Sequence, residues 1–203
     1  MTRNQLKYYI YTDIYRTYGF YDLKNIIKKY ILGKLNPGLK YMIVFRVSSY
    51  YKDNKHNIFN KIIYAIINNK LKRMQVKYGI EISNLTNVGN GIYIPHNGGI
   101  VIHYNAIIGN NCTILHDTTI GINAFKDRKG AAIIGNNVTI GAGSKIIGKV
   151  KIGDNVTIGA NSVVTKDVPD GAVVVGNPAK IISFKKPLLI NCDYLSENRF
   201  LMK

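Results

Sequence analysis

The chain has 203 residues, with 28 Lys and Arg against 11 Asp and Glu and a formal net charge of +17. The surplus is concentrated in residues 1–80, which hold 16 basic and 3 acidic side chains. Such a region suits an acidic partner, such as a membrane surface, an anionic glycan or a lipid-linked phosphate, although solvated lysine-rich helix faces give the same composition. No nucleic-acid-binding motif accompanies the charge, so we expect no nucleic acid partner.

The cysteines and the apolar segments bear on the compartment. Cys112 and Cys192 are too few for a disulfide framework, and both are expected to be free thiols in a reducing environment. The N-terminus has no apolar run of signal-peptide length, and Lys, Arg or Asn interrupts the longer apolar segments before they could cross a bilayer. We expect a cytoplasmic protein, with peripheral contact to the inner face of the membrane left open.

Residues 1–80 are predicted to form a small α-helical domain. Pro37 occupies the first-turn position of a helix that runs to about Tyr51. The next helix is predicted from about Asn57 to Lys77, because apolar side chains recur there on one stripe. This stripe is expected to pack on the following domain or on another subunit. Its members are Ile58, Phe59, Ile62, Ile63, Ile66, Ile67, Leu71 and Met74.

A period of six dominates the rest of the chain. Ile or Val occupies every register position, namely Val88, Ile94, Ile102, Ile108, Ile114, Ile120, Ile134, Ile140, Ile146, Ile152, Ile158 and Val164. This period fits neither an α-helix nor a long strand, and it is typical of short strands joined by tight corners. We predict a mainly β fold, a left-handed parallel β-helix of hexapeptide repeats, in residues 81–180. Residues 181–203 are expected to form a C-terminal tail.

Two insertions interrupt this period. The spacing from Ile94 to Ile102 is eight positions, which adds two residues around 96–99. A longer insertion holds the polar stretch 123–130. Insertions into a rigid stack must leave it as loops, and function concentrates in such loops. We therefore expect both loops to belong to a functional site.

Stacked coils leave flat hydrogen-bonded walls exposed. Threefold packing is the usual way in which such prisms cover these walls, so we expect a homotrimer with sites between neighbouring subunits. A further pairing of trimers through the helical region is left open.

Two histidines are predicted to meet. His96 and His116 each lie two places after a register aliphatic residue, and they are separated by one coil plus the two-residue insertion. They should stack on adjacent coils about 5 Å apart, either as a proton-transfer pair or with one of them only lining the site. With His103 they also raise the question of zinc, but their spacing argues against it, and we expect no metal.

Several segments, including the Gly-Ile-Tyr-Ile-Pro-His run at 91–96, carry a resemblance to a known family. The segments are residues 12–15, 36–39, 91–102, 140–148, 158–168 and 175–179. Together they resemble the serine acetyltransferases of the hexapeptide-repeat acyltransferases over about residues 10–182. The chain is most similar to short relatives in bacterial capsule and O-antigen loci. The resemblance implies an acetyltransferase that uses acetyl-CoA.

The resemblance also implies roles for individual residues. His96 matches the general base that takes the acceptor hydroxyl proton while that oxygen attacks the acetyl thioester. Glu81 matches the carboxylate that orients this histidine and stabilises its imidazolium. Other positions match small residues along the coenzyme arm and lysines near the coenzyme phosphate. These positions are Gly121, Gly141, Ala142, Ala160, Lys166 and Lys180.

The acceptor is less well defined by the resemblance. Asp13 and Arg128 match acceptor-binding residues, whereas Pro95 replaces an Asp that holds an amino group and Lys129 replaces a second histidine. Loss of one carboxylate should weaken binding of an ammonium by about 1–3 kcal/mol. This favours a sugar hydroxyl of a capsule or O-antigen polysaccharide or its precursor. L-serine in cysteine synthesis, N-acetylation of a nucleotide-linked amino sugar and a non-catalytic trimeric scaffold stay open as alternatives.

Overall fold

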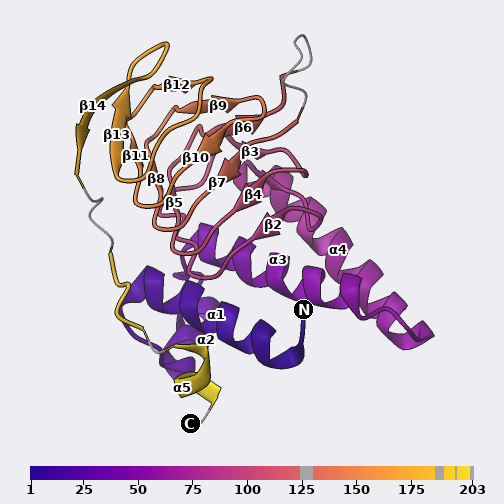
Figure 1. Ribbon diagram of the computed structural model, residues 1–203. Helices are drawn as coiled ribbons and strands as arrows, with labels where there is room; N and C mark the ends of the chain where they lie inside the picture. The colour runs from indigo at the N-terminus through magenta and orange to yellow at the C-terminus, as the bar shows by residue number, and fades with distance from the viewer. Residues whose placement is uncertain (124–129, 186–189, 195, 202–203) are drawn as a thin grey trace.

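The computed structural model describes residues 1–123, 130–185, 190–194 and 196–201, in which a helical region precedes a stack of short strands (Figure 1). The helices of the first region are α1 (Arg3–Tyr18), α2 (Leu23–Ile31), α3 (Pro37–Asp53) and α4 (Ile58–Tyr78). The predicted beginning of α3 at Pro37 is confirmed, and α4 begins one residue after the predicted Asn57. No helix in the described part of the chain is long and apolar enough to cross a membrane.

Three sheets form the walls of the strand region. The strands are β1 (Ile80–Ile82), β2 (Asn87–Val88), β3 (Ile100–Ile102), β4 (Ile107–Ile108), β5 (Thr113–Ile114), β6 (Thr119–Gly121), β7 (Ile133–Ile134), β8 (Thr139–Ile140), β9 (Lys145–Ile147), β10 (Lys151–Ile152), β11 (Thr157–Ile158), β12 (Val163–Val164), β13 (Ala172–Val175) and β14 (Lys180–Phe184). Sheet A has the order β1-β3-β6-β9-β12, sheet B the order β2-β4-β7-β10, and sheet C the order β5-β8-β11-β13-β14. Every pairing is parallel except that of β13 with β14. The prediction of a parallel β-helix is therefore confirmed.

The period of six forms the core of this β-helix. In sheet A the register aligns Ile102 with Ile120 and Ile120 with Ile146, and all three side chains are buried. Equivalent columns of buried Ile and Val occupy sheets B and C. One aliphatic side chain per wall thus fills the interior of each coil, and burial of such a side chain contributes about 1.5–3 kcal/mol.

Asparagines form the corners between sheets B and C. Asn111, Asn137 and Asn155 all have positive φ, near 58°, which Asn tolerates better than most residues. Their amides form a ladder, because Asn111 donates to Asn137 and Asn137 donates to Asn155, each at 3.1 Å. The repeat therefore needs these residues for the shape of the turn as well as for hydrogen bonding between coils.

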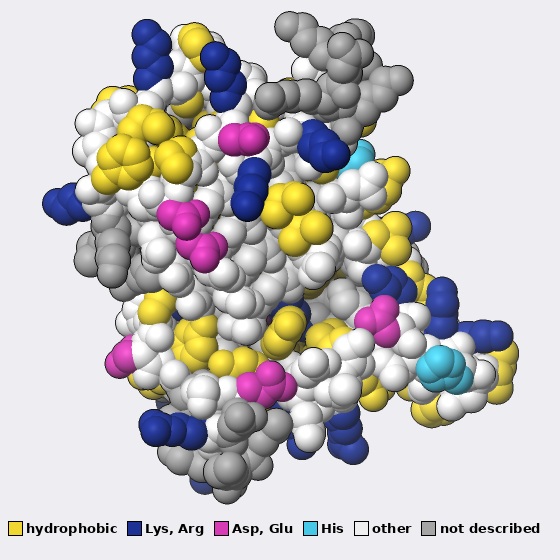
Figure 2. Space-filling view, viewed as in Figure 1, with side chains coloured by type: hydrophobic (Ala, Val, Ile, Leu, Met, Phe, Trp, Pro, Cys, Tyr) yellow, Lys and Arg dark blue, Asp and Glu magenta, His cyan; other side chains and the backbone are white. Residues whose placement is uncertain are grey.

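The apolar stripe predicted on α4 has two different environments. Leu71 is buried and Met74 packs against the core shared with α3 and the first coils. Ile58, Phe59 and Ile66 at the other end are exposed, and α4 projects away from the β-helix there (Figures 1 and 2). Only the C-terminal half of the stripe therefore packs on the following domain as expected.

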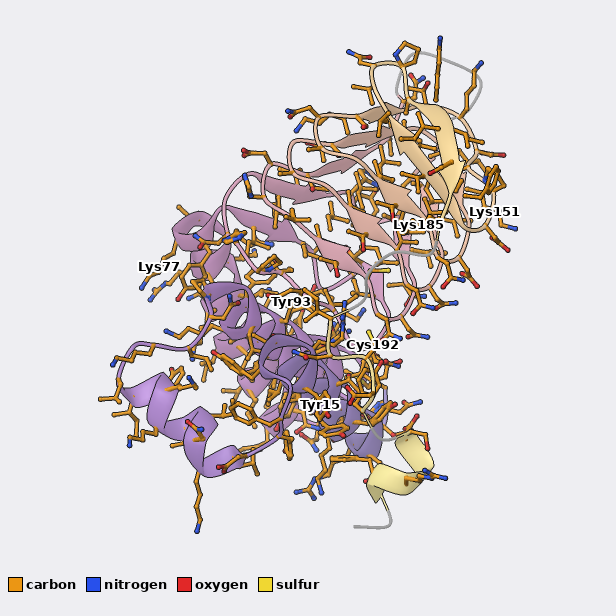
Figure 3. The ribbon with its side chains drawn as sticks, turned by 90° about the vertical axis from the view of Figure 1, so that its left-hand side faces the viewer. Tyr15, Lys77, Tyr93, Lys151, Lys185 and Cys192 are labelled. Atoms are coloured by element: carbon orange, nitrogen blue, oxygen red, sulfur yellow. The ribbon has the colours of Figure 1, made fainter. Side chains whose placement is uncertain are left out.

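The C-terminal tail returns to the helical region. After β14 the chain brings α5 (Glu197–Leu201) beside α1 (Figure 1), where Phe200 stacks on Tyr11 with ring centroids 4.4 Å apart. Figure 3 shows Cys192 at the junction between the β-helix and the helices. Here Arg16, which is fully buried, donates to the carbonyl of Ile190 and to the Cys192 sulfur. The tail thus supplies acceptors for a buried cation.

Candidate active site

The two predicted histidines meet at the corner between sheets C and A. Tyr93 bridges Thr113 of β5, so the chain leaves sheet C just before His96 and enters sheet A at β3. The rings of His96 and His116 lie edge to face, with centroids 5.9 Å apart. This confirms the predicted stacking, while their roles stay predictions. The buried Nδ1 of His116 has no hydrogen-bond partner in the described residues.

The beginning of α3 holds the His96 loop in place. Asn36 caps this helix by accepting from the Leu39 N–H at 2.9 Å, and its amide donates to the Pro95 carbonyl at 3.0 Å. A Cβ added to Gly38 would lie 2.3 Å from the Ile94 carbonyl oxygen, so only glycine permits this close approach. The Asn-Pro-Gly segment therefore fixes the backbone that carries His96.

Asn36→Asp tests this positioning role, because the carboxylate still accepts from Leu39 but no longer donates to Pro95. We expect kcat to fall about ten- to a hundredfold, since small misplacements of a catalytic group are costly, while KM for acetyl-CoA stays the same. Steady-state kinetics measure both values, and thermal unfolding checks that the cap persists. Unchanged kcat in a folded variant would show that the loop does not depend on this bond.

Small residues continue the column below His116. Ala142 and Ala160 lie two places after the register residues of β8 and β11, as His116 does after β5. Backbone hydrogen bonds join these corners from coil to coil. The Gly143 N–H donates to the His116 carbonyl at 3.0 Å, and the Asn161 N–H donates to the Ala142 carbonyl at 2.8 Å. The corner thus offers a strip of small side chains that begins at the histidines.

Gly141 has a packing role of its own in this strip. A Cβ at this position would lie 2.5 Å from the Ala160 nitrogen, so the next coil alone demands glycine. Gly121 differs, because an added Cβ there would make only an ordinary contact with the Ile147 side chain at 3.4 Å. The structure therefore explains Gly141 without a ligand and leaves Gly121 open to one.

The two lysines predicted near the coenzyme phosphate share one groove. Lys166 and Lys180 both line a cavity of about 260 Å³ at the last coil, together with Asp167 and the Pro178-Ala179 pair. Two ammonium groups beside one carboxylate leave a local excess of positive charge, which suits a phosphate.

Glu81 does not contact His96. Among the described residues no hydrogen bond or ion pair joins the two side chains, and Glu81 points outward from sheet A, where it pairs with Val101. It lines a cavity of about 500 Å³ together with His103 and Gly121. His103 was given no role by the sequence, yet strand alternation through Val101 places it on the same outward face. This alternation is the signal that could have found it.

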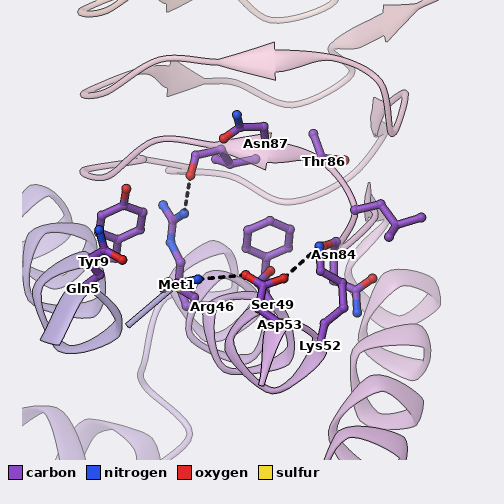
Figure 4. A pocket seen from close by; sticks show the side chains of 13 residues that line it. Met1, Gln5, Tyr9, Arg46, Ser49, Lys52, Asp53, Asn84, Thr86 and Asn87 are labelled. Atoms are coloured by element: carbon purple, nitrogen blue, oxygen red, sulfur yellow. Dashed lines mark hydrogen bonds and ion pairs between the residues drawn. The ribbon is translucent and has the colours of Figure 1, made fainter. Parts of the chain in front are cut away.

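The structure contradicts acceptor binding by Asp13. Its carboxylate is fully buried and accepts from Arg46 Nε at 2.9 Å and from the Ile92 N–H at 2.8 Å. Arg46 also donates to the Val88 carbonyl at 2.7 Å (Figure 4). Asp13 is therefore an internal ion-pair partner that ties α1 to α3 and to the first coil, and no acceptor can reach it.

The other predicted acceptor residues have different outcomes. Arg128 and Lys129 lie outside the described residues. Pro95 is half-buried beside His96, with its carbonyl engaged by Asn36. The cavity of about 310 Å³ in Figure 4, between α1, α3 and the first coil, contains none of the predicted site residues.

The described side chains also limit the chemistry. Burial raises the pKa of the Cys112 thiol to about 12, so this thiol stays protonated and cannot serve as a nucleophile. Within the described ranges no three His, Cys, Asp or Glu side chains gather closely enough to hold a metal ion. The corner therefore offers a histidine base, a strip of small residues and a basic groove.

Comparisons with known proteins agree with this arrangement. Residues 131–166 match the family model described as bacterial transferase hexapeptide (six repeats). A serine acetyltransferase of Helicobacter pylori is 34% identical over 149 residues, which cover 73% of this chain and 83% of that protein. Chloroplastic serine acetyltransferase 1 of Arabidopsis thaliana is 43% identical over 126 residues, 62% of this chain but only 39% of the plant protein. Soybean serine acetyltransferase complexed with serine superposes with a TM-score of 0.70 at 28% identity, covering 87% of this chain and 69% of that one.

The fold and these matches place the chain among the left-handed β-helix proteins that are built from hexapeptide repeats. Within that class, the chain belongs to the serine acetyltransferase family. It spans well under two thirds of several of the relatives it matches, including 39% of the Arabidopsis protein.

Proposed function

We propose that this chain is an O-acetyltransferase that moves the acetyl group of acetyl-CoA to a hydroxyl acceptor, with His96 as general base. The observation that carries the proposal is the corner on which His96 and His116 stand above the small side chains of Ala142 and Ala160. Three coils separate His96 from Ala160, about 15 Å at one strand spacing per coil, so an extended thioester arm could lie along this edge.

The reaction follows from the position of His96. Its imidazole takes the proton of the acceptor hydroxyl while that oxygen attacks the thioester carbonyl. The tetrahedral intermediate collapses to the ester, and the coenzyme A thiolate leaves and takes the proton back from the imidazolium. Glu81 lies on β1, which pairs with β3, and it lines a cavity with His103, so we assign it no direct part in this proton transfer.

For the acceptor we propose the hydroxyl of L-serine. The family supports this choice, because the Helicobacter and Arabidopsis relatives are named serine acetyltransferases and the soybean relative was solved with serine. A sugar hydroxyl of a polysaccharide or its precursor is the second candidate. Two observations favour it, since Pro95 brings no charge to the site and Asp13 is buried in an ion pair.

Pro95→Asp tests which acceptor the site prefers. An added carboxylate beside His96 should bind the ammonium of serine, so we expect kcat/KM for L-serine to rise about five- to a hundredfold over the unmodified chain. Turnover of uncharged sugars should not rise. The measurement is coenzyme A release with L-serine and with a panel of sugars as acceptors. An unchanged preference would mean that the acceptor is held elsewhere.

We propose a homotrimer as the working assembly. Ile107 and Ile133 on the outer face of sheet B are partly exposed in the single chain, and a neighbouring coil stack would cover them. Sedimentation velocity distinguishes a trimer from a monomer.

A further inference from the structure

Helix α2 exposes an apolar face that nothing in the described structure covers. Exposed fractions are 52% for Leu23, 56% for Ile27 and 75% for Ile31, whereas Ile26 of the same helix is buried. Lys24 and Lys28 flank this face and are exposed. Isolated exposed aliphatic residues are ordinary. Three of them on one face of a helix, each about one turn from the next, form a patch that marks an interaction surface.

A basic groove lies at the C-terminal end of this helix. It has a volume of about 430 Å³ and is lined by Tyr30 and Ile31 of α2 together with Lys40, Lys70 and Lys77 of α3 and α4. Its remaining lining residues are Val44, Met74 and Tyr78. No carboxylate is among these residues, and in the described part of the chain none of the three lysines forms an ion pair. Figure 3 places Lys77 at the outer edge of the helical region.

The charge of the surrounding sequence is strongly positive. Residues 22–80 contain thirteen Lys and Arg and two acidic residues, Asp22, which caps the N-terminus of α2, and Asp53, which is paired with Lys52 and the N-terminus. An apolar stripe with lysines beside it is typical of helices that lie in the interface of an anionic bilayer. The three-lysine groove would accept lipid phosphates next to that stripe.

We propose that α2 and the adjoining groove dock on an anionic lipid surface. The apolar side chains of Ile27 and Ile31 enter the interface, while Lys24, Lys28 and the groove lysines meet the headgroup phosphates. A second copy of the same face is a poorer occupant, because a symmetric contact would place these lysines against each other without acidic partners. This proposal concerns the location of the protein, and it does not depend on which acceptor the protein uses.

Vesicle binding tests this proposal on the full chain. We expect the protein to sediment with vesicles of equal parts phosphatidylglycerol and phosphatidylcholine, and not with phosphatidylcholine alone. Lys24→Gln with Lys28→Gln should weaken the binding about fivefold for each lysine, and rising salt should weaken it further. Ile31→Ser should weaken it as well, because an apolar side chain no longer enters the interface.

Matched controls lie on the β-helix. Lys149→Gln with Lys185→Gln removes the same charge from exposed positions, and Ile182→Ser alters an aliphatic residue that is 62% exposed. Neither control should change the binding. Equal losses in controls and test variants, or equal binding to both kinds of vesicle, would overturn the proposal. So would a change of sedimentation mass in Ile31→Ser without vesicles, because the face would then belong to a contact between copies.

Discussion

His96→Ala is expected to lower coenzyme A release by about two to four orders of magnitude, the usual contribution of a positioned general base. The His96 side chain is exposed, and among the described residues its one side-chain interaction is the ring contact with His116, so its removal should leave the fold intact. The measurement is turnover with acetyl-CoA and saturating acceptor. A loss in kcat with an unchanged KM for acetyl-CoA would indicate that chemistry and not coenzyme binding has been affected.

His56→Ala is the matched control for this variant. His56 is exposed just before α4, far along the chain from the predicted corner, so its turnover should equal that of the unmodified protein. His103→Ala is the third variant to measure, because His103 lines the same cavity as Glu81. If His103→Ala lost activity while His96→Ala kept it, the base would lie on the outer face of sheet A and the assignment of His96 would be wrong.

Asp13→Ala is expected to destabilise the protein by about 3–5 kcal/mol, because it leaves Arg46 buried without its counter-ion. The carboxylate also accepts from the Ile92 N–H, so a buried backbone donor loses its partner at the same time. Urea unfolding measures the change in free energy. A loss of this size is a large share of the stability of a domain, so the variant should be partly unfolded at physiological temperature.

Asp53→Ala is the control for Asp13→Ala, because Asp53 forms its ion pairs at the surface. Asp53 binds the N-terminal ammonium and Lys52 with its side chain 40% exposed, and such pairs contribute about 0–1 kcal/mol. If Asp13→Ala cost no more than Asp53→Ala, Asp13 would not be the internal partner described here. Impaired serine turnover in a fully stable Asp13 variant would restore its predicted role in acceptor binding.

The β-helix could be predicted because its signal is local. Outside the two insertions, each register aliphatic residue, such as Ile108 in β4, is followed six positions later by one in the next wall of the same prism, such as Ile114 in β5, so the sequence period is the structural period. The contact between His96 and His116 could be predicted from the same spacing, because one coil plus the two-residue insertion separates them. Spacing is sufficient wherever neighbouring coils repeat one geometry.

Contacts between the helical region and the coils could not be predicted in this way. Asp13 meets Arg46 over 33 residues, and no local pattern distinguishes a buried carboxylate from one that faces a substrate. The return of the tail depends on Arg16, whose acceptors Ile190 and Cys192 lie about 175 residues away. Such pairings arise from tertiary packing, which a single sequence does not display.

Coenzyme A release from acetyl-CoA in the presence of L-serine tests the central claim most directly. The account predicts saturable release that depends on the acceptor, with one O-acetylserine formed for each thiol released, and almost none from His96→Ala. Release that depends on sugars and not on serine would identify a sugar hydroxyl, the second candidate, as the acceptor. No release with L-serine or with any sugar would contradict the assignment of this chain as an O-acetyltransferase.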